Sequence, residues 1–298
     1  MKVSKAVITA AGLGTRLLSV TKEMPKEMLP LFSPSRTQEI GVKPVLQLIF
    51  EQLYEKGVRL FCFIVGRGKR SVEDFFTPDY HYVELLRKRG KVEAAEELED
   101  FYRKIESSVV VWINQPEPQG FGDAVLRSEP FVGDEPFLVY AGDTYIISEG
   151  HGFLERMLNA FTDGKAHAVL LLKEIPKASQ LKHYGVAEVE ESGEPYLEVV
   201  RVVEKPEKPP SNLAIMPVYI FSHEIFASLK TIPKGRGNEL QLTDAIQHMI
   251  TRGLSVRGVK MVDGEVRLDV GVPETYWEAL KYSYSHALSE AGRSSGEN

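Results

Sequence analysis

The stretch "AVITAAGLGTRLL", residues 6–18, decides the fold and raises the question of which anion its glycine-bearing loop holds. A run of small and β-branched residues leads directly into Ala11, Gly12, Gly14, Thr15 and Arg16. An apolar strand that enters a flexible loop and then a fixed cation commonly presents backbone N–H groups to a phosphate. The stretch therefore predicts a phosphate-binding loop at the end of a buried strand.

The length and composition are those of a globular protein. The 298 residues suffice for one large α/β domain or two modest ones, and a hydrophobic fraction of 43% supplies a core. The formal net charge is -6 and the acidic residues are spread along the chain. This argues against a general nucleic-acid-binding protein, which usually carries a basic face. A polyanionic ligand would therefore need cations placed locally around it.

Nothing in the sequence indicates a membrane or an exported protein. No stretch reaches the roughly 18 apolar residues of a membrane span, and "MKVSKAVITAAG" lacks the apolar core and cleavage site of a signal peptide. We therefore expect a cytoplasmic protein. The single cysteine, Cys62, lies in the apolar run "LFCFIV", which excludes disulfides and thiolate metal clusters and favours a buried strand residue over a reactive thiol.

Strand-like apolar runs alternate with segments of helical period along the chain. The strand-like runs are "KAVITA", "RLFCFIV", "SVVVWI", "EPFLVYAGD" and "AHAVLLLKEI". This alternation predicts a Rossmann-like α/β fold, in which a mixed, mostly parallel sheet is flanked by helices. Ligands of such sheets lie at the carboxyl ends of the strands.

Residues 79–107 are heavily charged, with apolar residues at helical spacing. They predict two exposed helices broken near Gly90, a solvated excursion rather than a part of the active site.

The pattern changes past Lys205. A helix in "ELQLTDAIQHMITRG", short strands near residues 254–269 and a closing helix from about Pro273 form a small C-terminal α/β subregion. Because no linker is long enough to separate two independent units, we expect one domain over residues 1–298. Its first half covers about residues 1–145 and its second half about residues 146–298.

Two other phosphate-binding motifs fit the glycine loop less well. Leu17 stands where a dinucleotide fingerprint has its third glycine, no acidic residue follows a second strand, and no G-K-[ST] of a P-loop is present. Instead, Lys26 follows in "PKEMLP", where two prolines fix the backbone. A nucleoside triphosphate, with roughly four negative charges, is the anion that Arg16 and Lys26 favour. From this segment alone, a tight turn followed by surface cations is the alternative.

The longer segment "AGLGTRLLSVTKEMPKEMLPL" resembles the signature of the sugar-1-phosphate nucleotidylyltransferases, and in particular of the bacterial and archaeal branch that uses UTP and glucose-1-phosphate. Further similar segments follow in family order: "QPEPQGFGDAVL", "EPFLVYAGD", "HYGVAEV", "VVEKP", "PSNLAIMPVYIFS", "GNELQLTDAI" and "RLDVG". The resemblance implies the nucleotide-diphospho-sugar transferase fold, with a nucleotide-binding first half and a sugar-binding second half. It also implies Mg²⁺-assisted attack of a sugar-1-phosphate oxygen on the α-phosphorus of UTP, with pyrophosphate leaving in line.

Such a transfer needs positioning and cations rather than a protein nucleophile. We therefore expect Arg16 and Lys26 to act on the triphosphate and the leaving pyrophosphate. Lys205, in "VVEKP", is expected by resemblance to bind the attacking phosphate. These three residues are the expected catalytic groups.

Two aspartates occupy strand ends. Asp143 ends "PFLVYAGD" and Asp269 ends "VRLD", and hard oxygen ligands of this kind suit Mg²⁺. For either residue alone, a turn or cap carboxylate is the alternative. By resemblance, the two aspartates hold the metal.

The same motifs suggest how the sugar is bound. In a strand Glu204 and Lys205 would point to opposite faces. In similar proteins the chain turns here, so that the glutamate accepts hydrogen bonds from sugar hydroxyls. Tyr184 and Gly185 resemble the family position where the backbone approaches the hexose, although a glycine also fits a plain turn. In "LTDAI", Thr243 and Asp244 are interpreted as helix-capping residues.

Base recognition is assigned to Gln115 and Gly120. A glutamine amide both donates and accepts, which matches a pyrimidine edge, and a glycine lets the main chain come close. Uracil and thymine share that edge, so UTP and dTTP both stay open, although "TKEMPKEMLP" and residues 79–107 look more like the uridylyltransferase branch.

A remote alternative is a non-catalytic sensor of sugar nucleotides, which would be expected to lack a phosphate-binding lysine or a metal aspartate. The family is usually dimeric or tetrameric, so we expect a homodimer or homotetramer. The segment "FSPSRTQEIGVKPVLQ" is longer than the usual family link, which leaves the placement of Arg36 and Lys43 open.

Overall fold

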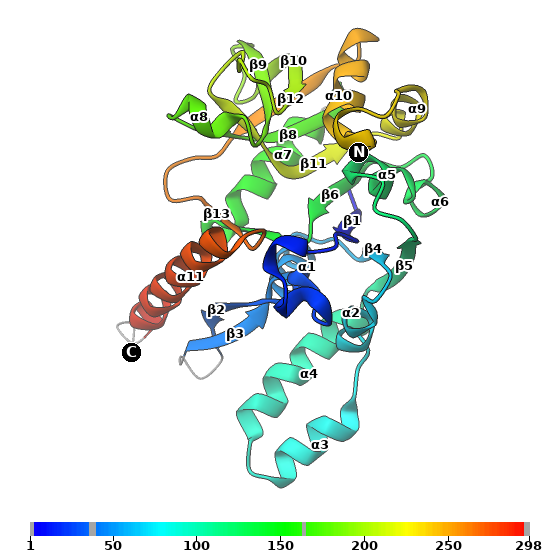
Figure 1. The fold of residues 1–298 in the computed structure, drawn as a ribbon. Helices are drawn as coiled ribbons and strands as arrows, with labels where there is room; N and C mark the ends of the chain where they lie inside the picture. The colour runs from blue at the N-terminus through cyan, green and yellow to red at the C-terminus, as the bar shows by residue number, and fades with distance from the viewer. Residues whose placement is uncertain (1–2, 36–39, 163–164, 295–298) are drawn as a thin grey trace.

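A mixed β-sheet runs through the molecule (Figure 1). The computed structural model describes residues 3–35, 40–162 and 165–294. Its main sheet has nine strands in the order β5-β4-β1-β6-β11-β8-β12-β10-β9, and β13-β7 and β2-β3 form two small sheets. The strands are β1 (Lys5–Ala10), β2 (Pro30–Pro34), β3 (Ile40–Pro44), β4 (Leu60–Gly66), β5 (Val109–Gln115), β6 (Phe137–Ala141), β7 (Thr144–Ile147), β8 (Ala168–Glu174), β9 (Gly185–Glu191), β10 (Leu197–Glu204), β11 (Leu213–Phe221), β12 (Val256–Lys260) and β13 (Val266–Asp269).

Helices cover both faces of the main sheet. They are α1 (Val45–Glu55), α2 (Arg70–Phe75), α3 (Tyr80–Lys88), α4 (Val92–Glu106), α5 (Phe121–Leu126), α6 (Glu129–Val132), α7 (Gly152–Thr162), α8 (Ala178–Leu181), α9 (Glu224–Thr231), α10 (Leu242–Thr251) and α11 (Pro273–Ser294). Period-two alternation in β1 sends Ile8 to a core that it shares with α1, α4 and α7, and Val7 to a second core shared with α5, α9 and α10.

The expected α/β fold is confirmed, and the parallel part of the sheet lies mainly in the first half. Strands β5, β4, β1 and β6 are parallel, whereas β11 runs antiparallel to both β6 and β8. Strands β9, β10 and β11 follow one another without room for a crossover helix, so β9 pairs antiparallel with both β10 and β11. Because a strand of the second half completes the sheet of the first, we infer a single domain.

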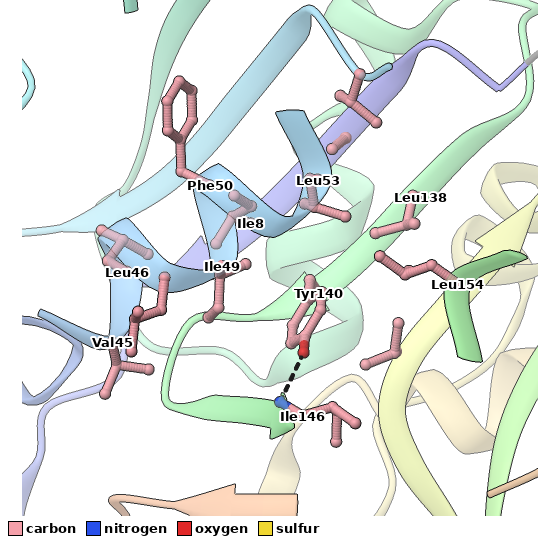
Figure 2. Packing of buried hydrophobic residues seen from close by; sticks show 14 of the residues in the cluster. Ile8, Val45, Leu46, Ile49, Phe50, Leu53, Leu138, Tyr140, Ile146 and Leu154 are labelled. Carbon is pink, nitrogen blue, oxygen red and sulfur yellow. Dashed lines mark hydrogen bonds between the residues drawn. The ribbon is translucent and has the colours of Figure 1, made fainter. Parts of the chain in front are cut away.

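Helix α1 packs against strands β1 and β6 of the main sheet (Figure 2). Leu46, Ile49 and Leu53 pack beside Ile8 of β1 and Leu138 of β6. Beside them, the buried Tyr140 hydroxyl accepts a hydrogen bond of 3.1 Å from the Ile146 amide and donates to Gln52. This phenol braces the turn between β6 and β7, which carries Asp143.

Several smaller expectations are also confirmed. The charged excursion forms α3 and α4, which break at Gly90 (φ +75°) and project together at the bottom of Figure 1. The closing helix is α11, which packs along β2. Cys62 is fully buried in β4, and burial raises the pKa of its thiol to about 12. Within the described residues, no helix is both long enough and apolar enough to cross a membrane.

Candidate active site

A cavity of about 550 Å³ opens where β1, β5 and β6 end. This is the carboxyl edge at which a ligand is expected. Ten of the residues selected from the sequence line it: Ala11, Gly12, Gly14, Thr15, Arg16, Lys26, Gln115, Gly120, Asp143 and Lys205. The proposed nucleotide-binding and catalytic groups therefore lie around one space.

The glycine loop is folded back against the segment that follows it. Gly14 adopts φ +65°, and its carbonyl accepts a hydrogen bond of 2.8 Å from the Thr21 hydroxyl. A Cβ on Gly12 would lie 3.4 Å from the Lys26 ammonium nitrogen. The loop needs its glycine at Gly14, where φ is positive and a Cβ would lie 3.0 Å from the Thr21 side chain, while Gly12 lies in contact with the lysine that shares its cavity.

Lys26 forms an ion pair with Asp143 across the cavity floor. Burial alone would lower the pKa of Lys26, but the carboxylates of Asp143 and Glu27 raise it. Burial alone would raise the pKa of Asp143, but the Lys26 ammonium, with help from Arg267, holds it below its usual value. Both groups are therefore charged before any ligand arrives.

A second, more deeply buried ion pair lies next to the first. Glu27 is 1% exposed and its carboxylate accepts a hydrogen bond of 2.9 Å from Lys69. Burial raises the pKa of Glu27, and the ammonium groups of Lys69 and Lys26 oppose this shift. Sequence reasoning missed Lys69, although "GRGK" directly follows the carboxyl end of β4, beside the glycine loop. Its place on that sheet edge was the available signal.

Asp269 reaches the same region from the far end of the chain. In the β13–β7 ladder it lies opposite Thr144, next to Asp143, and the Val270 amide donates to the Asp143 carbonyl oxygen over 3.1 Å. One carboxylate oxygen accepts from the Gly271 amide at 3.0 Å and from the Thr275 hydroxyl at 2.9 Å, and the other pairs with Arg267.

Asp143 and Asp269 offer carboxylate oxygens of the kind that Mg²⁺ takes, usually one or two from the protein with the rest of its shell from phosphate oxygens and water. Over the described ranges, no group of three or more His, Cys, Asp or Glu side chains is placed to hold a metal. A metal held by Asp143 and Asp269 would thus depend on a phosphorylated ligand.

The chain turns sharply where β10 ends. Lys205 adopts φ +42°, a conformation that is unusual for a residue with a side chain and that frequently marks a functional site. Its ammonium lies 3.0 Å from Glu204, so both side chains lie on the same side of the turn. The expected departure from a regular strand is therefore present.

Thr243 supports this turn and was misinterpreted from the sequence. Helix α10 has no side-chain cap, and the Thr243 hydroxyl instead donates a hydrogen bond of 2.7 Å to Glu204. A Cβ on Gly185 would lie 3.0 Å from that hydroxyl and 3.4 Å from the Glu204 carboxylate. Gly185 is thus a glycine because Glu204 and Thr243 fill the space beside it.

Gln115 is 4% exposed and ends β5. Its amide nitrogen donates to Asp123 at 2.7 Å and to the Gly120 carbonyl at 3.2 Å, which leaves its side-chain oxygen as the acceptor for a ligand. Gly120 adopts φ +108°, and a Cβ there would meet the Leu240 carbonyl at 2.7 Å. Packing against Leu240 explains this glycine, and its approach to a base stays a prediction.

The remaining expected residues lie beside the first cavity. Tyr184 and Asp269 line a neighbouring cavity of about 480 Å³ between α11 and the sheet, whereas Gly185 and Glu204 contact the Lys205 turn. Lys43 lies in β3 and pairs with Glu51 at 2.9 Å, in neither cavity lining. Arg36 lies outside the described residues.

Known proteins resemble this chain over most of its length. UTP–glucose-1-phosphate uridylyltransferase YngB of Bacillus subtilis is 39% identical over 250 residues, 83% of this chain and 79% of that protein. The enzyme of the same name from Staphylococcus haemolyticus is 37% identical over 255 residues, 83% of this chain and 82% of that protein.

Solved structures give the same result. A UDP-glucose pyrophosphorylase in complex with UDP-glucose superposes with a TM-score of 0.82 at 31% identity, covering 96% of this chain and 100% of that one. A UTP-bound UGPase from Acinetobacter baumannii has a TM-score of 0.82 at 26% identity and 99% coverage of both chains. The sequence model of the nucleotidyl transferase family matches residues 5–285. The chain therefore belongs to the nucleotidyl transferase family.

Proposed function

We propose that the protein transfers a uridylyl group from UTP to glucose-1-phosphate, giving UDP-glucose and pyrophosphate. The observation that carries this proposal is the convergence of Arg16, Lys26, Asp143 and Lys205 on one cavity, from segments distant in the sequence. Relatives named for this reaction are 36–39% identical to the chain over 250–255 aligned residues.

The reaction brings two anions together, so cations must act where negative charge develops. Arg16 and Lys26, next to the glycine loop, would bind the triphosphate and the departing pyrophosphate. Lys205, on the opposite wall, would bind the phosphate of glucose-1-phosphate and direct its oxygen at the α-phosphorus. The protein contributes positioning and charge, and no side chain forms a covalent bond to substrate.

Asp143 and Asp269 are the proposed ligands of Mg²⁺, which when bound would neutralise charge on the phosphate oxygens. In the structure Asp143 is paired with Lys26, so the carboxylate that would hold the metal and the lysine that would bind the triphosphate lie side by side, both charged.

Specificity is proposed to come from two short segments. The free side-chain oxygen of Gln115 would accept the ring N–H of uracil, while Glu204, held by Thr243, would accept hydrogen bonds from hexose hydroxyls. Thymine carries the same ring N–H, so use of dTTP is the second candidate function.

We also propose a homodimer or homotetramer, because α11 exposes Trp277 (59%) and Leu288 (48%) on one side.

A pyrophosphate-release assay tests these proposals. UTP, dTTP, CTP and ATP are each combined with glucose-1-phosphate and with other hexose-1-phosphates, in the presence of Mg²⁺. We expect the highest kcat/KM for UTP with glucose-1-phosphate. A higher value for dTTP would reverse the nucleotide assignment, and no pyrophosphate from any pair would favour a non-catalytic sensor.

A further inference from the structure

The Arg267 side chain contacts two proposed site residues that lie far apart in the sequence, Asp269 and Tyr184. Arg267 lies two residues before Asp269 in β13, and the period of a strand places both side chains on one face. The guanidinium pairs with the Asp269 carboxylate and donates to the Tyr184 hydroxyl at 3.3 Å and to the Thr144 hydroxyl at 3.4 Å. A proposed metal ligand and a proposed sugar-binding residue are thus bonded to the same side chain.

The Arg267 side chain is held firmly. The side chain is 17% exposed, and its Cζ atom lies 5.5 Å from the centre of the Tyr184 ring. A planar guanidinium with several fixed donors loses little further freedom for each hydrogen bond that it makes. Arg267 therefore sets the positions of its partners more than they set the position of Arg267.

The direction of the bond to Tyr184 has a chemical consequence. A phenol has one hydrogen to donate and two lone pairs. Because the Tyr184 oxygen accepts from Arg267, its own hydrogen is left to donate to another group. The backbone around it lies against the turn proposed to bind the sugar: the Tyr184 carbonyl accepts a hydrogen bond of 3.0 Å from the Lys205 amide, and Gly185 lies beside Glu204.

We propose that Arg267 is a positioning residue of the sugar subsite, which orients the Tyr184 hydroxyl as a donor to the hexose and fixes Asp269 beside it. The inference rests on the proposed function, because it takes the hexose of glucose-1-phosphate and UDP-glucose as the ligand. It adds a residue that binds no substrate atom itself but determines how strongly the sugar is held.

Lys173 provides a matched control. It lines the same cavity, and no described residue forms an ion pair or hydrogen bond with its ammonium. Burial and the charge of Arg267 lower the pKa of Lys173, as expected for two neighbouring cations. Lys173→Gln therefore removes a positive charge from beside Arg267 and leaves the bonds to Tyr184 and Asp269 in place.

The test compares the binding of UDP and UDP-glucose by titration calorimetry, so that UDP reports on the nucleotide site alone. In the wild type, UDP-glucose should bind more tightly than UDP. Arg267→Gln should weaken the affinity for UDP-glucose by about tenfold, the size expected for a lost charge-assisted hydrogen bond. The same variant should change the affinity for UDP by less than about twofold. Lys173→Gln should weaken UDP-glucose binding much less than Arg267→Gln does, because it leaves the bonds from Arg267 to Tyr184 and Asp269 in place.

A double-mutant cycle decides whether the effect passes through Tyr184. Introduced alone, Tyr184→Phe should weaken the affinity for UDP-glucose. Added to Arg267→Gln it should have little further effect, because the positioned donor is already lost. Arg267→Lys should restore only part of the affinity, since an ammonium lacks the planar fork.

The outcomes separate the two proposals. Three outcomes would each overturn the positioning role while the function stands. They are equal losses of affinity for UDP and UDP-glucose in Arg267→Gln, equal effects of Lys173→Gln and Arg267→Gln on UDP-glucose affinity, and additive effects in the double-mutant cycle. A wild-type protein that forms no UDP-glucose and binds it no better than UDP would refute the proposed function, and this inference with it.

Discussion

The side chains of Lys26 and Asp143, 117 residues apart in the sequence, form an ion pair on the floor of the nucleotide cavity. Lys26 comes from the short turn after the glycine loop, and Asp143 from the turn between β6 and β7. The pair brings the proposed phosphate-binding cation and the proposed metal-binding carboxylate within reach of one ligand. Four predictions follow from this site and its supports.

Lys26→Gln should lower kcat for pyrophosphate release by roughly 10²–10³-fold, because it removes a preorganised charge from the leaving phosphates. Lys22→Gln is the control, since Lys22 is 77% exposed and, among the residues that the structure describes, pairs with Glu23 alone. Circular dichroism should show a folded protein in both cases. Wild-type turnover by Lys26→Gln would refute its assignment.

Removal of divalent metal with EDTA should abolish pyrophosphate release, and added Mg²⁺ should restore it. Asp269→Asn should raise the Mg²⁺ concentration for half-maximal rate by about tenfold, since it weakens one of two carboxylate ligands. The exposed Asp263→Asn serves as the control. An unchanged Mg²⁺ requirement in Asp269→Asn would remove Asp269 from the metal site.

Lys69→Met should destabilise the fold by about 3 kcal/mol in urea unfolding near neutral pH, because it leaves the Glu27 carboxylate buried and unpaired. The double variant Glu27→Gln/Lys69→Met removes the isolated charge and should recover most of the loss.

The pH dependence of Lys69→Met has a definite sign. Without the ammonium that opposes the effect of burial, the pKa of Glu27 in the folded state rises further above its unfolded value. A folded carboxyl with a raised pKa stabilises the protein when protonated and costs stability as pH rises through that pKa. The deficit relative to wild type should therefore shrink as pH falls toward the unfolded pKa of glutamate. A deficit that grows in acid would contradict this account.

Thr243→Val should raise KM for glucose-1-phosphate by about fivefold with little change in KM for UTP, because Glu204 loses the hydrogen bond that orients it. Thr251→Val is a fitting control: its hydroxyl bonds only within the last turn of the same helix, to the Gln247 carbonyl at 2.9 Å and the Gln247 side chain. Equal effects of the two variants would indicate a general loss of helix packing.

Local sequence patterns predict the strands, the helices and the charged residues at strand ends. β1 reads as a buried strand because its apolar residues run together, and Asp143 follows β6 at the edge where ligands bind. Which strands run antiparallel was harder to predict, because strand direction in the second half depends on short connections rather than on the composition of the strands.

The missed residues are those whose roles depend on distant partners. Thr243 has the sequence context of a helix cap, and only the fold brings Glu204 to it. Lys69 and Arg267 were not selected from the sequence, because their roles depend on Glu27 and Tyr184, which only the fold places beside them. The three pairs join residues 39, 42 and 83 positions apart, a separation that propensity and periodicity do not encode.

Strand β11 lies antiparallel between β6 and β8, in the middle of the main sheet. Backbone hydrogen bonds, rather than a hinge, therefore join the half that carries Lys26 to the half that carries Lys205. A fragment that stopped after β7 would leave the edge of β6 unpaired, and an exposed strand edge promotes aggregation. We therefore expect that neither half, with its proposed reactant subsite, can be truncated or exchanged without disrupting the other.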